Sequence, residues 1–182
     1  VTITVPTQIP SVSNLSVTTG MNLEVDLPFY ATDPNDLAVT YSVSSDPVHG
    51  SVDQAADVFT YTPDADYLGS DSLQYTASNN TYTSAPATVS ITVNSRVPVA
   101  NEYNVFTATN TPVILAFSAN DPFGETLSYT IESNPSYGSV SESNGVWTYT
   151  PNQDVIGSDS FTYKASNGTF VSEAANINIS IG

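Results

Sequence analysis

The stretch Tyr149–Thr169, YTPNQDVIGSDSFTYKASNGT, matches the stretch Tyr61–Thr81, YTPDADYLGSDSLQYTASNNT, 88 residues earlier in the chain. Shifting the whole sequence by 88 residues aligns Ile9–Asn94 with Val97–Gly182 without a gap, and roughly 34 of the 86 aligned pairs are identical. Self-similarity at a fixed period is typical of repeat architectures. The sequence therefore predicts two homologous domains, one in residues 9–94 and one in residues 97–182.

The same shift places the opening VTITVPTQIP, Val1–Pro10, over VSITVNSRVP, Val89–Pro98. Since Val89–Asn94 closes the first copy, we expect residues 1–8 to be the last strand of a preceding repeat plus a linker. The chain is accordingly expected to be a segment of a longer array, whose neighbouring repeats are its first partners.

Each copy consists of short runs of alternating apolar and polar residues, and turn residues interrupt these runs about every ten residues. Helix-forming residues do not gather at a 3.6-residue period. The pattern predicts an all-β fold, with an immunoglobulin-like Greek-key β-sandwich in each copy. The strands expected in the second copy are Tyr103–Thr107, Val113–Ala119, Leu127–Ser133, Gly138–Ser141, Val146–Thr150, Ser160–Ser166, Thr169–Ser172 and Asn176–Ile181.

The composition excludes several classes of function. The chain has 18 Asp and Glu against 2 Lys and Arg, a net charge of −16, no Cys and a single His, His49. Without Cys, neither a Cys nucleophile nor a structural zinc site of the usual kind is available. The acidic excess repels phosphate backbones and anionic headgroups, so we expect no nucleic-acid partner and no membrane insertion. Divalent cations remain compatible with this charge.

The second copy contains DPFGETLSY, Asp121–Tyr129, followed in Gly138–Gly168 by the motifs YGSV, VWTYTP and GSDSFTY. Together these motifs resemble the bacterial cadherin-like repeats that occur in tandem in large secreted adhesins and in some polysaccharide-degrading enzymes. The resemblance covers both copies almost end to end. It implies an extracellular or cell-surface location, an extended multidomain protein and frequent calcium binding.

Two aspartate–tyrosine pairs, Asp71 with Tyr75 and Asp159 with Tyr163, have the spacing seen where immunoglobulin-type sandwiches form a tyrosine corner. An aspartate there can accept turn N–H groups, while the tyrosine hydroxyl reaches back to the backbone. We therefore predict a structural role for all four residues. Trp147 lies on an alternating strand, and we expect it to be a core side chain.

Candidate calcium ligands lie between the second and third expected strands of each copy. They are Asp33 and Asp36 in the first copy and Asp121 and Glu125 in the second. Calcium takes roughly six to eight oxygen ligands, so the two carboxylates of one loop are too few. Further ligands must come from another part of the chain.

Greek-key topology suggests where these ligands would come from. The turn that carries Asp64 and Asp66 is expected at the end of the first copy that faces the second, near Asp121, Glu125 and Asn167. A calcium site at the repeat junction is then geometrically reasonable.

Two departures from the family pattern weigh against calcium. Arg96 occupies the linker where an acid would assist a cation, and Leu37 stands where the motif has Asp or Glu. Arg96 can replace the metal by pairing with the same carboxylates. A calcium site, an Arg96 ion pair and an uncoordinated acidic face therefore all remain open.

No catalytic set is evident, and we predict that the chain is not an enzyme. His49 has Tyr137 at the equivalent place in the second copy, so an imidazole is not required there. The leading hypothesis is a spacer in the stalk of a secreted or surface-anchored bacterial adhesin. One alternative is a carbohydrate-binding module that uses exposed tyrosines such as Tyr30, Tyr103 and Tyr137. Another is homotypic adhesion through strand edges.

Overall fold

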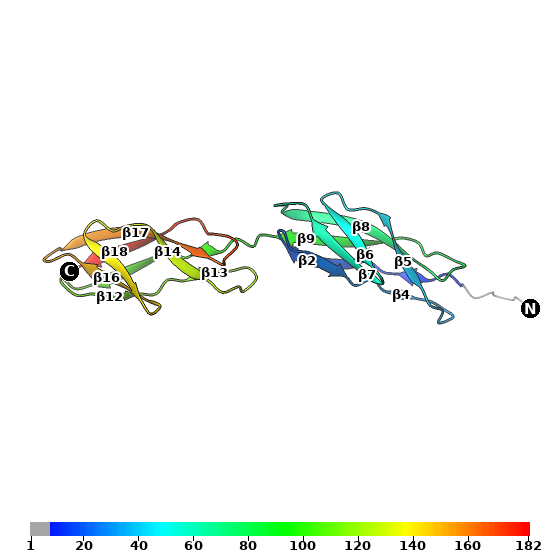
Figure 1. Cartoon of the computed structure of the whole chain (residues 1–182), viewed down its shortest axis with the longest axis horizontal. Coiled ribbons are helices and arrows are strands. Elements are labelled where there is room, and N and C mark those ends of the chain that lie inside the picture. Colours follow the sequence, from blue (N-terminus) through cyan, green and yellow to red (C-terminus); the bar gives the residue numbers. More distant parts are fainter. Residues whose placement is uncertain (1–7) are drawn as a thin grey trace, which may run out of the picture. The chain divides into compact units, whose positions relative to one another are not determined.

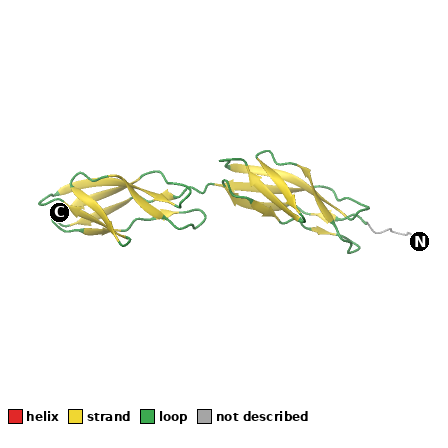
Figure 2. Ribbon diagram, viewed as in Figure 1, coloured by secondary structure: helices red, strands yellow, loops and turns green. Residues whose placement is uncertain are grey.

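A computed structural model describes residues 8–182, which form two compact units divided between Ser95 and Arg96 (Figure 1). The regular elements of both are strands joined by loops (Figure 2), so the predicted all-β fold is confirmed. The described residues contain no helix that could span a membrane. The strand predicted within residues 1–8 for a preceding repeat falls outside the described residues, apart from Gln8.

Unit 1 is a sandwich of two sheets. The four-stranded sheet has the order β2-β9-β8-β5, the three-stranded sheet has the order β3-β7-β6, and β1 pairs with β4. The strands are β1 (Ser11–Val12), β2 (Leu15–Gly20), β3 (Val25–Leu27), β4 (Ala31–Thr32), β5 (Thr40–Ser45), β6 (Gly50–Ala55), β7 (Val58–Pro63), β8 (Gly69–Ser78) and β9 (Ala87–Asn94).

Unit 2 repeats this topology strand for strand. Its sheets have the orders β11-β18-β17-β14 and β12-β16-β15, and β10 pairs with β13. The strands are β10 (Val99–Ala100), β11 (Tyr103–Thr107), β12 (Val113–Leu115), β13 (Ala119–Asn120), β14 (Ser128–Ser133), β15 (Gly138–Ser143), β16 (Val146–Pro151), β17 (Gly157–Ser166) and β18 (Ala175–Ile181).

The first and last long strands of each unit are parallel neighbours. In unit 1, β2 pairs with β9 from Leu15↔Val89 to Gly20↔Asn94, and in unit 2, β11 pairs with β18 from Tyr103↔Ile177 to Thr107↔Ile181. The other strand pairs are antiparallel. The chain passes from one sheet to the other between β2 and β3, between β3 and β5, between β5 and β6 and between β7 and β8, which gives the predicted immunoglobulin-like Greek key.

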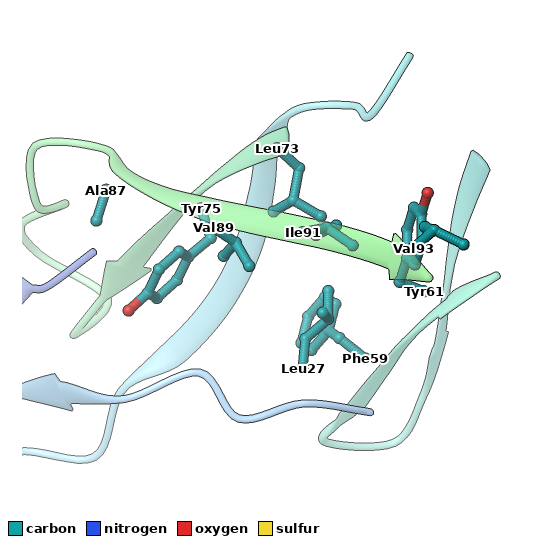
Figure 3. Close-up of a cluster of buried hydrophobic side chains, with 9 residues drawn as sticks. All are labelled: Leu27, Phe59, Tyr61, Leu73, Tyr75, Ala87, Val89, Ile91 and Val93. Carbon is teal, nitrogen blue, oxygen red and sulfur yellow. The ribbon is translucent and has the colours of Figure 1, made fainter. Parts of the chain in front are cut away.

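The core of each unit lies between its two sheets. Alternate residues of β9, namely Val89, Ile91 and Val93, are buried, while the residues between them are more exposed. This alternation follows from the two-residue period of a strand, which places every second side chain on one face. Figure 3 shows the unit 1 core, in which side chains of β9 lie opposite Leu27 and Phe59 of the other sheet. Trp147 packs against the corresponding core of unit 2, so its predicted core role is confirmed.

Two strand predictions for the second copy were wrong. The segment predicted as Val113–Ala119 is split into β12 and β13, because the carbonyl of Ser118 accepts the hydroxyl of Tyr163 at 2.8 Å and the N–H of Asn101 at 3.0 Å. The segment Thr169–Ser172 contains only one bridge, Ser166↔Val171.

The missing strand at Thr169–Ser172 has a simple cause. The N–H of Ala165 donates to the side-chain Oγ of Ser172 at 3.0 Å, where a continuing ladder would offer a backbone carbonyl. The serine side chain thereby ends the pairing.

The predicted tyrosine corners are confirmed. The hydroxyl of Tyr163 lies 2.6 Å from the carbonyl oxygen of Asn101 and 2.8 Å from that of Ser118. The hydroxyl of Tyr75 lies 2.8 Å and 3.2 Å from the carbonyl oxygens of Ser13 and Tyr30. Both tyrosine side chains are fully buried, so water cannot replace either hydroxyl as a hydrogen-bond partner of these carbonyls.

We expect Tyr163→Phe to lower the free energy of unfolding of unit 2 by about 1–2 kcal/mol, because the carbonyls of Asn101 and Ser118 lose the hydrogen bond from the hydroxyl of a buried side chain. Trp147 is the chain's single tryptophan and lies in unit 2, so its fluorescence during urea unfolding reports on this unit. Tyr137→Phe, at a tyrosine 54% exposed, is the matched control and should be silent. Equal stabilities for Tyr163→Phe and the control would contradict the structural role of the hydroxyl.

Candidate functional site

Each unit encloses an aspartate, early in its longest strand, that accepts hydrogen bonds from several directions. In unit 2, Asp159 at the start of β17 is 7% exposed. Its carboxylate accepts the N–H groups of Ser136, Tyr137 and Ser160, each at 2.9 Å, and the hydroxyl of Tyr149 at 2.8 Å. A buried charge is tolerated when its hydrogen-bonding capacity is filled in this way.

Three sequence motifs converge on this carboxylate. GSDS supplies Asp159, WTYTP supplies Tyr149, and YGSV supplies the N–H of Tyr137. The residue after Tyr137 is a glycine, Gly138, because a Cβ at that position would collide with the ring of Tyr149. The role of Tyr149 was missed from the sequence, although its identity with Tyr61 in the first copy was a usable signal.

Unit 1 builds the same network around Asp71. Its carboxylate accepts the N–H groups of Val48 and His49 at 3.0 and 2.9 Å, and the hydroxyl of Tyr61 at 3.0 Å. The contribution of His49 to this network is its backbone N–H, while its ring stacks on Tyr67 with the centroids 4.3 Å apart. This explains why His and Tyr are interchangeable at the position.

The predicted metal ligands of unit 2 lie together, and we call Arg96, Asp121, Glu125 and Asn167 the Arg96 cluster. Nη2 of Arg96 lies 2.8 Å from Oε1 of Glu125, and the Arg96 side chain is 14% exposed. Nδ2 of Asn167 lies 3.0 Å from Oδ2 of Asp121 and 2.7 Å from Oε2 of Glu125. The ion pair considered from the sequence is therefore present.

Asn167 is the hub of the Arg96 cluster; the sequence predicted that it lies near Asp121 and Glu125 but indicated no role for its side chain. Its Oδ1 accepts the N–H groups of Thr169 and Phe170 at 3.2 and 2.8 Å, which fixes the orientation of the amide. Its Nδ2 therefore faces the two acids, and it also lies 2.9 Å from the carbonyl oxygen of Arg96.

The electrostatics of Asp121 agree with this geometry. The N–H of Glu125, above all, lowers the pKa of Asp121, burial opposes this shift, and the amide of Asn167 and the N–H of Phe123 lower the pKa further. The carboxylate is thus held charged by N–H donors.

Unit 1 has a counterpart of the cluster that lacks the ion pair. Nδ2 of Asn79 lies 2.7 Å from Oδ2 of Asp33 and 3.0 Å from the carbonyl oxygen of Gln8. Gln8 stands at the position of Arg96, and Leu37 at the position of Glu125. The asparagine, the aspartate and a leading carbonyl are common to both units, and the ion pair is specific to unit 2.

The remaining predicted ligands of unit 1 are dispersed. Asp36 lies in the same loop as Asp33 and adopts a φ of 56°. Asp64 and Asp66 follow β7, where Oδ1 of Asp66 accepts Nδ2 of Asn22 at 2.9 Å. Within residues 8–182 no group of three or more His, Asp or Glu side chains is placed to hold a metal ion. Sharing of Asp64 and Asp66 with the acids of unit 2 stays a prediction.

The side chains of the Arg96 cluster do not fit a calcium ion. Oδ1 of Asp121 accepts the N–H groups of Phe123 and Glu125, each at 2.9 Å, and the other carboxylate oxygens accept from Asn167 and Arg96. Calcium is ligated by oxygen atoms, whereas here N–H groups point into the space between the carboxylates. No metal chemistry is therefore derived for this cluster.

The family follows from the sequence of both units together. A family model described as "Bacterial Ig domain" matches residues 5–92 and again residues 94–180. The chain belongs to the bacterial Ig domain family. The predicted bacterial cadherin-like or Ig-like tandem repeat is thus confirmed. Domains of this family are generally non-catalytic modules and typically occur in extracellular or surface proteins.

Solved structures with a similar strand arrangement come from several kinds of protein. An endo-fucoidan hydrolase of glycoside hydrolase family 107 is 17% identical with a TM-score of 0.39, and the match covers 98% of this bacterial Ig chain and 29% of that chain. The ectodomain of human desmocollin-1 is 12% identical with a TM-score of 0.42, over 93% of this chain and 40% of that one. Protocadherin gamma B7 is 14% identical with a TM-score of 0.44, over 95% and 51%.

This bacterial Ig chain spans 29% of the length of the fucoidan hydrolase that it matches. No curated protein sequence matches the chain. The family assignment rests on the two matched repeats and on the strand topology of each unit.

Asp159 predicts a pH dependence of stability. Burial on its own would raise the pKa of Asp159, but the hydroxyl of Tyr149 and three backbone N–H groups outweigh it and hold the pKa below 3.8. A lowered folded-state pKa stabilises the fold at pH values above 3.8, and this stabilisation is lost as the pH falls through the folded-state pKa.

We expect Asp159→Asn to lower the free energy of unfolding of unit 2 by about 1–3 kcal/mol at pH 7, with a smaller difference from the natural chain below pH 3.8. Urea unfolding followed by Trp147 fluorescence across a pH series measures this. Glu102→Gln, at an exposed position, is the control and should show no such trend. A difference that stays constant with pH would mean that the charge of Asp159 has no part in stability.

Proposed function

We propose that the two units are non-catalytic spacer repeats from the stalk of a secreted or surface-anchored bacterial adhesin. The observation that carries this proposal is the parallel pairing of the first and last long strands in each unit. Repeats of such an array transmit load from their first strand to their last. The partners of a spacer are the neighbouring repeats of its own chain.

Parallel pairing determines how load acts on a unit. The chain runs into β11 at Tyr103 and leaves β18 at Ile181, so tension on the two ends pulls these neighbouring strands in opposite directions along their length. All the hydrogen bonds of the ladder then share the load. In an antiparallel hairpin pulled at its open end, the hydrogen bonds are loaded and broken one pair at a time.

The buried networks support the same function. Asp159 ties the turn before β15 to β17, which belongs to the other sheet, and Tyr163 ties β17 to the segments beside β10 and β13. These bonds connect elements across the sandwich. A load-bearing module requires internal cross-connections of this kind and no site of its own.

Single-molecule pulling tests the proposal, and the absence of Cys allows attachment points to be chosen freely. With Val99→Cys and Gly182→Cys, force shears β11 against β18. With Ile156→Cys and Gly182→Cys, force opens the β17–β18 hairpin at Gly157↔Ile181. Because the attachment site at Gly182 is shared, the two variants differ in the direction of loading.

We expect the Val99/Gly182 pair to unfold at the higher force, because several hydrogen bonds must break together. Each attachment variant is first checked for an unchanged thermal midpoint, so that a difference in force reflects direction and not stability. Equal unfolding forces in the two directions would remove the mechanical basis of the spacer proposal.

A second candidate function, binding of a neutral polysaccharide, is favoured by one feature of unit 2. A surface hollow of about 510 Å³ is lined by Tyr137, Asp154, Val155, Ile156 and Ser158. Tyr137 is 54% exposed and Ile156 75% exposed. An exposed aromatic ring beside carboxylate and hydroxyl groups offers a sugar ring both an apolar face and hydrogen-bond partners.

The equivalent surface of unit 1 is arranged differently, because the rings of His49 and Tyr67 stack on each other. A net charge of −16 opposes sulfated or uronic-acid polymers, so a neutral polysaccharide is the appropriate ligand class. Under this hypothesis Tyr137→Ala abolishes retention on an insoluble neutral polysaccharide, whereas His49→Ala leaves retention unchanged. Passage of the natural chain through such a matrix without delay rejects the hypothesis.

Homotypic adhesion through strand edges stays a prediction. The edge strands β5 and β14 each carry a register shift, at Val43/Ser45 and at Ile131/Ser133. Such bulges discourage the addition of a further strand.

A further inference from the structure

We infer that Arg96 holds the loops of its cluster together in place of a divalent cation, so that unit 2 is stabilised independently of calcium. The inference does not rest on the spacer proposal, because a spacer can be built with or without metal. It concerns the link between the leading residue Arg96, the loop of Asp121 and Glu125, and the turn of Asn167.

The carboxylates of the cluster already have hydrogen-bond donors on their oxygen atoms. Oε1 of Glu125 pairs with Nη2 of Arg96 at 2.8 Å, and Oε2 accepts Nδ2 of Asn167 at 2.7 Å. Both oxygens of Asp121 likewise accept N–H donors. A cation between these carboxylates would have to displace the guanidinium and the amide.

Asn167 cannot offer its side-chain oxygen to a metal without breaking its turn. The N–H groups of Thr169 and Phe170 bind its Oδ1, so rotating the amide would bring donors against donors. Asn79 in unit 1 is fixed in the same way by Thr81 and Tyr82. In both units the amide nitrogen is therefore the group that faces the aspartate.

The two copies differ at both members of the ion pair. Arg96 and Glu125 are both replaced by uncharged residues in unit 1, Gln8 and Leu37, while the asparagine and aspartate are kept. A glutamate that ligated a cation would have no need of an arginine at the leading position. Arg96 and Glu125 occur together in the second copy and are both replaced in the first, as expected of two residues that form an ion pair.

The surroundings of the guanidinium also favour an ion pair over a metal ion. The Arg96 side chain is 14% exposed, and its Cζ lies 5.6 Å from the centroid of the Phe170 ring. A delocalised cation is suited to a site with a carboxylate at its edge and an aromatic face beside it, whereas a hydrated divalent ion is not. The cluster thus gains its positive charge from the chain itself.

The first test asks whether calcium has a specific effect. The natural chain is freed of metal with a chelator, and its thermal unfolding is followed by Trp147 fluorescence in CaCl₂, in MgCl₂ and in NaCl at matched ionic strength. We expect the unit 2 midpoint to be the same in all three salts. A higher midpoint in CaCl₂ alone that disappears in Asp121→Asn would overturn the inference.

The second test measures the pair directly with the residues that unit 1 uses. Arg96→Gln and Glu125→Leu are made singly and together, and the equilibrium constant for unfolding of unit 2 is measured for the four proteins. We expect the double variant to be more stable than the two single effects predict, with a coupling of about fivefold in the folded-to-unfolded ratio. Adding 1 M NaCl should reduce this coupling.

Additive effects of the two substitutions would overturn the inference, because Arg96 would then contribute nothing through Glu125. Lys164 and Glu132, whose Nζ and Oε1 lie 3.1 Å apart on the exposed surface of the same unit, provide the matched control pair. Their coupling should be smaller than that of Arg96 and Glu125, since exposed ion pairs contribute little.

Discussion

A carboxylate buried between two β-sheets sets the arrangement of each unit. Asp159 must keep its charge in a place with little water, so it needs several donors, and these come from the turn before β15, from β16 and from its own strand. Because β15 and β16 lie in one sheet and β17 in the other, satisfying this charge fixes the sheets relative to each other. The need to hydrogen-bond this charge also determines the identity of residues that make no bond to the carboxylate. Gly138 is one of these, because it leaves room for the ring of Tyr149.

The tyrosine corner and the asparagine hub tie the chain together at the far end of β17. Tyr163 and Asn167 both bind carbonyls of the leading segment, at Asn101 and Arg96. With the interior fixed in this way, the surface is free to vary between copies. Phe106 and Ile114 are exposed in unit 2 at positions that hold Thr18 and Asp26 in unit 1, without any change of topology. A fold that keeps its internal hydrogen bonds while its surface varies is compatible with the proposed spacer function.

The charge of the chain has to be accommodated by the same fold. Residues 9–94 carry ten acids and neither Lys nor Arg, while the second copy has eight acids, Lys164 and, just before it, Arg96. Most of these acids are exposed, where water and salt screen their repulsion. The acids that are not exposed, such as Asp33, Asp71 and Asp159, are bound to N–H and O–H donors of the chain itself. Backbone, amide and guanidinium donors thus do locally what a bound cation would do.

The sequence alone determined the two repeats, the all-β sandwich, the tyrosine corners and the structural role of Asp71 and Asp159, because a two-residue period and an 88-residue self-match are properties of a linear pattern. Only the tertiary structure decided where hydrogen bonds override that pattern. The carbonyl of Ser118 accepts the hydroxyl of Tyr163, and this divides the strand predicted at Val113–Ala119. The Oγ of Ser172 accepts the N–H of Ala165, so the strand predicted at Thr169–Ser172 does not form. The tertiary structure also decided that the amide nitrogen of Asn167 faces the acids and that Arg96 forms an ion pair with Glu125. These contacts join residues far apart in the chain, and their direction depends on how the two sheets pack. A periodic pattern within one segment of sequence does not predict that packing.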